Sequence, residues 1–228
     1  SALARQPHLV FRDTTQDARF GLVSLAPLDA PDRTRATSDL SCERVAFGNG
    51  RGLCLHAEKS FFGLFTGFTA LVTGSDLKPR GTPITLEGKP SRARVSADGK
   101  YGAFTVFVLG DGYDTSFSTR TTIIDMASAA VVADLESFAV FRDGERFTAK
   151  DFNFWGVTFA HDGNTFYASL RTNGKTYLLR GDLAGRRFTV LRDNVECPSV
   201  SPDDRFIAFK KFIGPDPGAW RLAVLELS

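Results

Sequence analysis

VSADGKYGAF, residues 95–104, is one of three copies of a ten-residue pattern in this chain. The other copies are FAHDGNTFYA at 159–168 and VSPDDRFIAF at 200–209, and a weaker fourth lies at 45–55 around Asn49-Gly50. Each copy begins and ends with apolar residues and has Asp-Gly, Asp-Asp or Asn-Gly between them. These pairs suit a hairpin turn because Gly, Asn and Asp tolerate a positive φ. The pattern therefore predicts a repeated unit of strand, tight turn and strand.

A second pattern follows each copy and sets the size of the repeat. It is an apolar run that ends in an acidic residue and then Leu or Met, at Asp76-Leu77, Asp125-Met126, Asp182-Leu183 and Glu226-Leu227. Together with a degenerate copy ending at Leu28, the units are 44 to 57 residues apart. This is the length of a propeller blade. We expect an all-β fold: one β-propeller domain over residues 1–228, with about five units of four antiparallel strands, the full blades lying near 41–90, 91–138 and 139–194.

Composition agrees with a folded β protein. The chain has 228 residues, of which 21 are Phe and only one is Met, and aromatic side chains favour strands. A net charge of +2 supplies no basic field for nucleic acid, so we expect no nucleic-acid partner. The longest nearly apolar run, residues 102–110, falls short of the roughly 20 residues of a membrane helix, so we expect no membrane span.

Two of the copies carry a family resemblance. Ser-Ala-Asp-Gly-Lys at 96–100 and Ser-Pro-Asp-Asp-Arg at 201–205, each followed by an apolar strand and later by the apolar-acid-Leu pattern, resemble the blade repeat of TolB-like β-propellers. The resemblance covers about residues 40–228, and the chain is similar to exported TolB-like proteins of actinobacteria. It implies the fold and an exported location, in the periplasm, at the cell surface or outside the cell. It brings no catalytic motif with it.

The last unit stops after what should be its third strand. Five units would make an unusually small ring, and propellers usually close by pairing strands from both termini. We therefore expect the chain to be a piece of a propeller of six or more blades, incomplete at its C-terminus. The alternative is a complete five-bladed ring whose first unit donates the missing outer strand.

Cysteines and motifs define the expected chemistry. Cys42 and Cys54 lie on the two arms of the hairpin around Asn49-Gly50, and in an often exported fold family they predict a disulfide; the alternative is two buried free thiols. Scattered histidines and the lack of Cys-x-x-Cys give no metal site. No nucleophile elbow or phosphate loop is present, so we expect no cofactor and assign no catalytic residue.

Two segments interrupt the repeat and are the candidate binding loops. Residues 110–120 lengthen one blade, and residues 141–147 form an added hairpin before the next strand. Long loops on a rigid scaffold are where propellers place binding residues, and exposed aromatic and Arg side chains are common anchors. The candidate ligand-binding residues are Tyr113, Asp114, Arg120, Asn153 and Trp155. The alternative is solvated loops whose aromatic residues pack into the core.

These observations favour a non-enzymatic binding or scaffold propeller that presents loops to a protein or cell-envelope ligand. The alternative is a propeller hydrolase or lyase acting on glycans or peptides, with side chains from several blades, and a third option is the propeller part of a larger hydrolase. Asp98, Asp162 and Asp203 recur at the repeat turn, which indicates a structural role, since an active site needs one constellation and a scaffold repeats the same residue.

Overall fold

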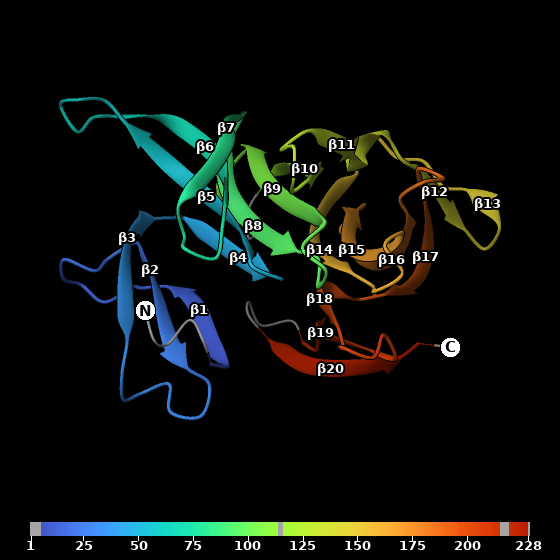
Figure 1. Ribbon diagram of the computed structural model, residues 1–228. Coiled ribbons are helices and arrows are strands. Elements are labelled where there is room, and N and C mark those ends of the chain that lie inside the picture. Colours follow the sequence, from blue (N-terminus) through green and yellow to red (C-terminus); the bar gives the residue numbers. More distant parts are fainter. Residues whose placement is uncertain (1–5, 114–115, 215–218, 228) are drawn as a thin grey trace.

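The chain forms five β-sheets in a computed structural model that describes residues 6–113, 116–214 and 219–227 (Figure 1). Apart from one turn of 3₁₀-helix, η2 (Leu135–Ser137), these residues form strands, turns and irregular connections. Across the same residues, no helix reaches the length and apolar character needed to cross a membrane. The all-β expectation is confirmed.

Five sheets follow one another along the chain. The first contains β1 (His8–Arg12), β2 (Leu22–Pro27) and β3 (Ala36–Ser41), and the second contains β4 (Arg44–Gly48), β5 (Arg51–Lys59), β6 (Phe65–Thr73) and β7 (Pro79–Leu86). The third contains β8 (Lys89–Val95), β9 (Tyr101–Leu109), β10 (Ser118–Asp125) and β11 (Val131–Asp134). The fourth contains β14 (Asn153–Phe159), β15 (Thr165–Thr172), β16 (Lys175–Asp182) and β17 (Arg187–Asp193), with β12 (Ala139–Arg142) and β13 (Glu145–Arg146) at its edge. The fifth contains β18 (Glu196–Val200), β19 (Phe206–Phe212) and β20 (Trp220–Glu226).

The first strands of successive sheets lie beside one another, which makes the arrangement a propeller. β4 packs against β8, β8 against β14 and β14 against β18, while β1 packs against β4. From each of these inner strands the sheet continues outward by antiparallel pairing. The predicted blades are therefore confirmed, with three or four strands in each blade rather than four throughout, and with two further strands at the edge of the fourth.

The fourth blade departs from the expected pattern. The hairpin expected at 141–147 is present as β12 and β13, with its turn at Asp143 and Gly144, both at positive φ. β12 pairs in parallel with β17, with Ala139 opposite Arg187, so the sheet gains two strands at its outer edge. The connection from the third blade runs along the outside of the fourth before it enters β14, which explains a parallel pair in a fold otherwise built from antiparallel ones.

The repeated turns gather at one end of the molecule, which we call the turn end. Asn49 Nδ2 donates to the Asp98 carbonyl oxygen at 2.8 Å, and the His161 N–H donates to Asp204 Oδ2 at 2.9 Å, so neighbouring turns bond to each other. The connections β5–β6, β9–β10, β15–β16 and β19–β20 leave the opposite ends of these strands. We call that side the loop end.

The recurring acidic residue stabilises each turn, as predicted. Asp98 Oδ1 accepts from the Ser96 hydroxyl at 2.6 Å and from the Lys100 N–H at 2.9 Å. Asp203 does the same with Ser201 and Arg205, at 2.5 and 3.2 Å. The bond from the Ser96 hydroxyl, with that from the Lys100 N–H, holds the pKa of Asp98 below its usual value.

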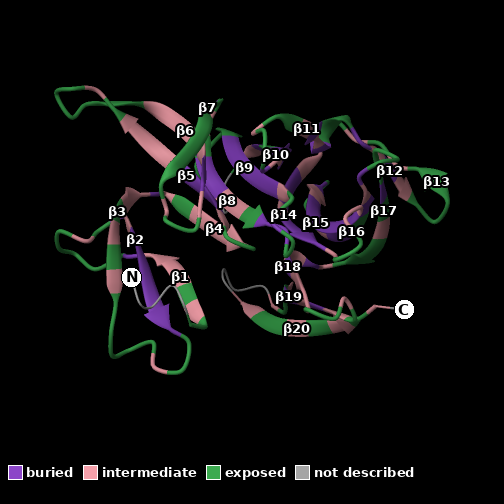
Figure 2. Cartoon of the chain, in the orientation of Figure 1, coloured by how far each residue is buried: buried purple, intermediate pink, exposed green. Residues whose placement is uncertain are grey.

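Figure 2 shows the buried segments on the strands of the blades. Phe is frequent among the buried residues. The rings of Phe154 and Phe188 stack at 5.3 Å, and Phe166 meets Phe188 edge-on at 5.4 Å. Ile123 of the third blade is buried in the same cluster. Five buried Phe residues therefore fill the space between the third and fourth blades: Phe138, Phe154, Phe159, Phe166 and Phe188.

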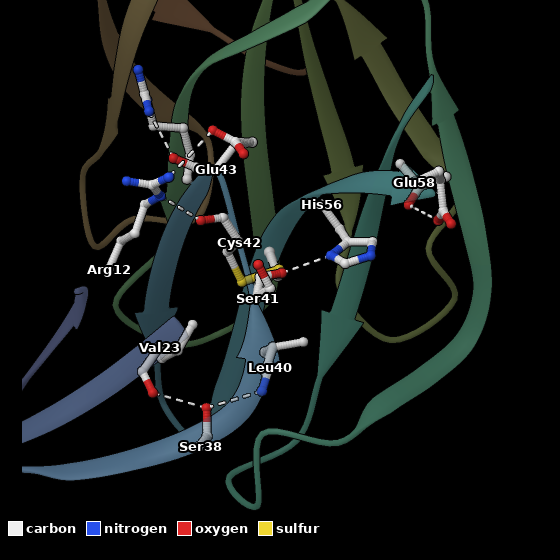
Figure 3. Close-up of a disulfide and its surroundings, with 12 residues drawn as sticks. Arg12, Val23, Ser38, Leu40, Ser41, Cys42, Glu43, His56 and Glu58 are labelled. Atoms are coloured by element: carbon white, nitrogen blue, oxygen red, sulfur yellow. Dashed lines mark hydrogen bonds and ion pairs between the residues drawn. A yellow bond between two sulfur atoms is a disulfide. The ribbon is translucent and has the colours of Figure 1, made fainter. Parts of the chain in front are cut away.

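A disulfide joins Cys42 to Cys54, as predicted, with the two Cα atoms 5.5 Å apart (Figure 3). Cys42 lies in the two-residue connection between the first and second sheets, and Cys54 lies in the middle of β5. Both are buried against Val23 of the first sheet. Arg12 Nε donates to the Cys42 carbonyl oxygen at 2.9 Å, so the bridge fastens the first sheet to the second.

The first and fifth sheets do not exchange strands in the part of the chain that the structure describes. β1 pairs with β2, and β20 pairs with β19. The strand donation expected for a closed five-bladed ring is therefore not seen among these residues.

We expect the double variant Cys42→Ser/Cys54→Ser to lose about 3 kcal/mol of unfolding free energy, because the bridge closes a short loop of the unfolded chain. Urea denaturation of the variant and of the unreduced protein measures this difference. In the unreduced, denatured protein, alkylation should label one thiol, Cys197, and after reduction it should label three. The variant Cys197→Ser is the control, and three labelled thiols without reductant would contradict the bridge.

Candidate functional site

A hollow opens at the loop end of the third, fourth and fifth blades. Its volume is about 460 Å³, and residues from three strand connections contribute to it. Tyr113 comes from the β9–β10 connection, Lys175 follows the β15–β16 turn, and Trp220 begins β20 after the β19–β20 connection. Because these connections leave corresponding ends of neighbouring blades, side chains far apart in the sequence meet here.

One wall of the hollow is aromatic and basic. The rings of Phe212 and Trp220 meet edge-on with centroids 5.2 Å apart. Lys210 Nζ lies 4.4 Å from the Trp220 ring centroid, within the range of a cation–π contact. Phe212 and Trp220 line the hollow and Lys210 does not, so a ligand there meets an aromatic face with a cation packed against one of its rings.

Tyr113 forms part of the opposite wall and is held by several contacts. Its ring lies 5.0 Å from Trp155 and 4.8 Å from Phe107 between centroids, and the Arg92 guanidinium lies 5.2 Å from it. Its hydroxyl is hydrogen-bonded to Ser91 Oγ at 2.5 Å. Burial raises the pKa of Tyr113 to about 12, so the phenol is neutral near pH 7. Tyr113 therefore lines the hollow as an uncharged aromatic side chain whose hydroxyl is already hydrogen-bonded.

Charged groups of both signs complete the lining. Arg171 and Lys175 supply positive charge, and Asp193 and Glu196 supply carboxylates. Burial raises the pKa of Glu196, which keeps its proton to higher pH than a solvated carboxyl. The hollow therefore combines rings, cations and a carboxyl with an altered pKa.

The predicted binding residues fall into different environments. Trp155 is 1% exposed and lies beneath Tyr113, with its indole N–H without a hydrogen-bond partner among the described residues. Asn153 Oδ1 accepts from the Thr119 N–H at 2.8 Å and so bonds the fourth blade to the third. Arg120 is exposed and pairs with Glu87. Asp114 lies outside the described residues. Of the predicted set, the structure places Tyr113 in the hollow and Trp155 in direct support of it.

Several residues of the hollow were missed by sequence reasoning. Phe212 and Trp220 flank the β19–β20 connection, which corresponds in its blade to the predicted 110–120 loop. Because equivalent connections of two blades lie at the same end of the propeller, this correspondence could have pointed to Phe212 and Trp220 as site residues. Arg171 and Glu196 carry no local motif, and only the meeting of three blades brings them together.

A buried carboxyl pair lies away from the hollow, after β11. Asp134 Oδ1 is buried and has no hydrogen-bond partner among the described residues. Glu136 as a residue is exposed, but both of its carboxyl oxygens accept from the Thr121 N–H, at 3.0 and 3.2 Å. Burial of this head group, with the Asp134 carboxyl beside it, raises the pKa of Glu136 to about 9. Through the Thr121 N–H the Glu136 carboxyl joins η2 to β10.

This pair gives the folding stability a defined pH dependence. The pKa of Glu136 is about 9 when folded against 4.5 for the free group, so the folded state holds the proton more tightly. The protonated Glu136 contributes its full share of the unfolding free energy below the pKa that it has in the unfolded chain. This contribution is lost as the pH rises toward the pKa that Glu136 has in the folded protein. We expect the difference in unfolding free energy between the protein and Glu136→Gln to change between pH 5 and pH 9 in urea titrations. An unchanged difference over that range would contradict the raised pKa of Glu136.

Substitutions at Trp155 and Arg120 should separate packing from surface contacts. Trp155→Ala empties a buried site and should cost about 3–5 kcal/mol of unfolding free energy. Arg120→Ala removes one exposed ion pair and should change it by less than about 1 kcal/mol. Thermal denaturation followed by circular dichroism measures both, with Trp155→Phe as the intermediate control. Equal effects of the two alanine variants would contradict this assignment.

Comparison with known proteins rests on structure, because no family model and no curated protein matches the sequence. TolB from Acinetobacter baumannii superposes with a TM-score of 0.60 at 16% identity, over 90% of this chain and 46% of that one. A putative TolB from Agrobacterium tumefaciens gives 0.61 at 17% identity, over 98% and 74%, and a chain of a nidogen/laminin complex gives 0.54 at 14%, over 96% and 78%. This chain thus spans about half the length of the first TolB. At these identities the likeness concerns the fold, which is a TolB-like β-propeller.

Proposed function

We propose that this propeller is a non-enzymatic binding module that holds a protein segment or a cell-envelope ligand in the hollow at the loop end. The observation that carries the proposal is the convergence of Tyr113, Lys175 and Trp220 from three blades on one hollow of about 460 Å³. A site of this size, with rings and a few polar groups, fits a small or extended ligand. Tyr and Trp are common binding anchors because they bury a large area and lose little conformational entropy.

The charges suggest which chemistry the ligand carries. Lys210 lies over Trp220, and Arg171 and Lys175 line the same hollow. Arg171 and Lys175 have no ion-pair partner among the described residues, so an acidic group on the ligand would gain a partner there. The aromatic wall would stack on a sugar ring or on an apolar side chain. A ligand with one flat apolar face and an acidic group near Arg171 and Lys175 fits this part of the lining, and Asp193 and Glu196 would pair with basic groups of the same ligand.

An exported location is part of this proposal. The Cys42–Cys54 bridge supports it, since disulfides persist in oxidising compartments. The likeness to TolB structures is compatible with it, although the likeness by itself concerns the fold alone.

A second candidate function is hydrolysis or elimination on a glycan or peptide. Its support is Glu196, whose pKa is raised by burial and which lies in the same hollow as Asp193. A general acid needs a raised pKa, and a second carboxylate nearby supplies the base. The two functions share the site and differ in the fate of the ligand.

Capture from a cell-envelope extract tests the binding function. Immobilised protein should retain a reproducible ligand, and Trp220→Ala should lower the retained amount at least about tenfold, because an aromatic anchor is removed. Arg221→Ala is the matched control, since the neighbouring residue is exposed and does not line the hollow. Equal retention by all three proteins would contradict a site in the hollow.

The same capture distinguishes binding from catalysis. A binding module returns its ligand unchanged in mass, and Glu196→Gln should retain as much ligand as the unsubstituted protein. An enzyme shortens the ligand, and Glu196→Gln should then abolish the shortening while still binding. Mass spectrometry of the eluted material separates these outcomes.

A further inference from the structure

The connection between β5 and β6 projects from the second blade as a finger (Figure 1). The tip of this finger is apolar. Its sequence from residue 59 to residue 65 is KSFFGLF. Phe61 is 98% exposed, Phe62 85%, Leu64 69% and Phe65 60%. Scattered exposed apolar residues are normal, but four large ones within five positions of one turn form a patch that water solvates poorly.

The tip is an ordered turn. The Gly63 N–H donates to the Ser60 carbonyl oxygen at 2.8 Å, and the Ser60 N–H donates to the Leu64 carbonyl oxygen at 2.7 Å. The Leu64 N–H also donates to Ser60 Oγ at 3.2 Å. Gly63 has φ +76°, which lets the chain reverse at this point. The turn satisfies several of its own polar backbone groups and holds Phe61 and Phe62 outward, so the cost of moving the tip into an apolar medium is reduced.

The charged residues nearest the tip lie at its base. No charged residue occurs between Lys59 and Asp76. Glu58, at the base, accepts from the Thr69 hydroxyl at 2.6 Å. Lys59 is exposed and stands directly behind the apolar tip. A strand pair adapted to remain in water usually carries charges near its exposed end, and this one carries Glu58 and Lys59 at its base and no charged residue at its tip.

Geometry and charge together favour a lipid bilayer as the occupant. A side chain exposed over 98% of its surface at the end of a projecting turn is open on every side, so a flat protein surface would cover only part of it. An acyl-chain medium surrounds such a tip completely. A lysine behind an apolar tip then lies at the depth of the lipid phosphates.

We propose that residues 60–65 insert into the interfacial layer of a lipid bilayer, with Lys59 at the phosphate groups. This inference is independent of the ligand in the hollow, because none of these residues lines it. One such tip gives reversible attachment, and anionic lipid strengthens it through Lys59.

Sedimentation with lipid vesicles tests the proposal. The full chain should co-sediment with phosphatidylcholine vesicles and more strongly with vesicles that also contain phosphatidylglycerol. Phe61→Ser/Phe62→Ser should lower the partition coefficient at least about tenfold on both. Lys59→Glu should weaken binding to the anionic vesicles more than to the neutral ones. The control is Phe20→Ser, which changes a Phe that is 49% exposed in the β1–β2 connection and should bind like the unsubstituted protein.

Two further measurements separate loss of lipid binding from loss of folding. The double variant should keep the thermal midpoint of the parent, since neither ring belongs to a core cluster. In the variant Phe62→Trp, the tryptophan fluorescence should shift to shorter wavelength when vesicles are added, relative to the unsubstituted protein. Lack of vesicle binding by the parent, or equal binding by the double variant, would overturn the proposal. So would a dimer that the double variant abolishes without any vesicle binding, because the tip would then be covered by a second copy.

Discussion

Each blade of this propeller is a small sheet with two faces, and it cannot bury both faces by itself. Burial comes from the neighbouring blades, as where Phe154 and Phe188 share one cluster with Ile123 of the preceding blade. Hydrogen bonds across the same interface follow the packing: Thr121 Oγ1 donates to the Phe154 carbonyl oxygen at 2.6 Å. The rest of the structure depends on this contact between blades, because it sets how far apart the inner strands lie and which connections become neighbours.

The packing separates the two ends of the molecule by role. At the turn end, the short connections share one feature: an Asp carboxylate accepts hydrogen bonds from groups of its own turn, as at Asp98. At the loop end, the connections differ in length and composition. A rigid frame of equivalent strands thus places unlike side chains such as Tyr113 and Trp220 around one hollow. Function is expected where the repeat is broken, since a repeated residue serves every blade alike.

The same distinction explains how much the sequence predicts. Features that depend on residues close together in the chain could be predicted from the sequence. They are the Asp-Gly turns, the β12–β13 hairpin and the Cys42–Cys54 disulfide. The parallel pairing of β12 with β17 could not be predicted, because it joins segments about fifty residues apart with no pattern of its own. Of the candidate binding residues that the structure describes, only Tyr113 lines the hollow. Arg171 and Glu196 belong to it solely because of how blades pack, and single-sequence periodicity does not report on that.

The finger and the hollow lie at the same end, and this follows from the strand order. The β4–β5 and β8–β9 turns bond to each other through Asn49 and Asp98, so the β5–β6 and β9–β10 connections emerge together at the opposite end. A tip inserted in a bilayer would therefore bring the loop end toward the lipid surface. Ligands of the hollow would then be met at that surface, which is where an envelope component or the exposed segment of a membrane-bound protein would be presented. Weak attachment is sufficient for this arrangement, because holding the module at the surface raises the effective concentration of any ligand fixed there.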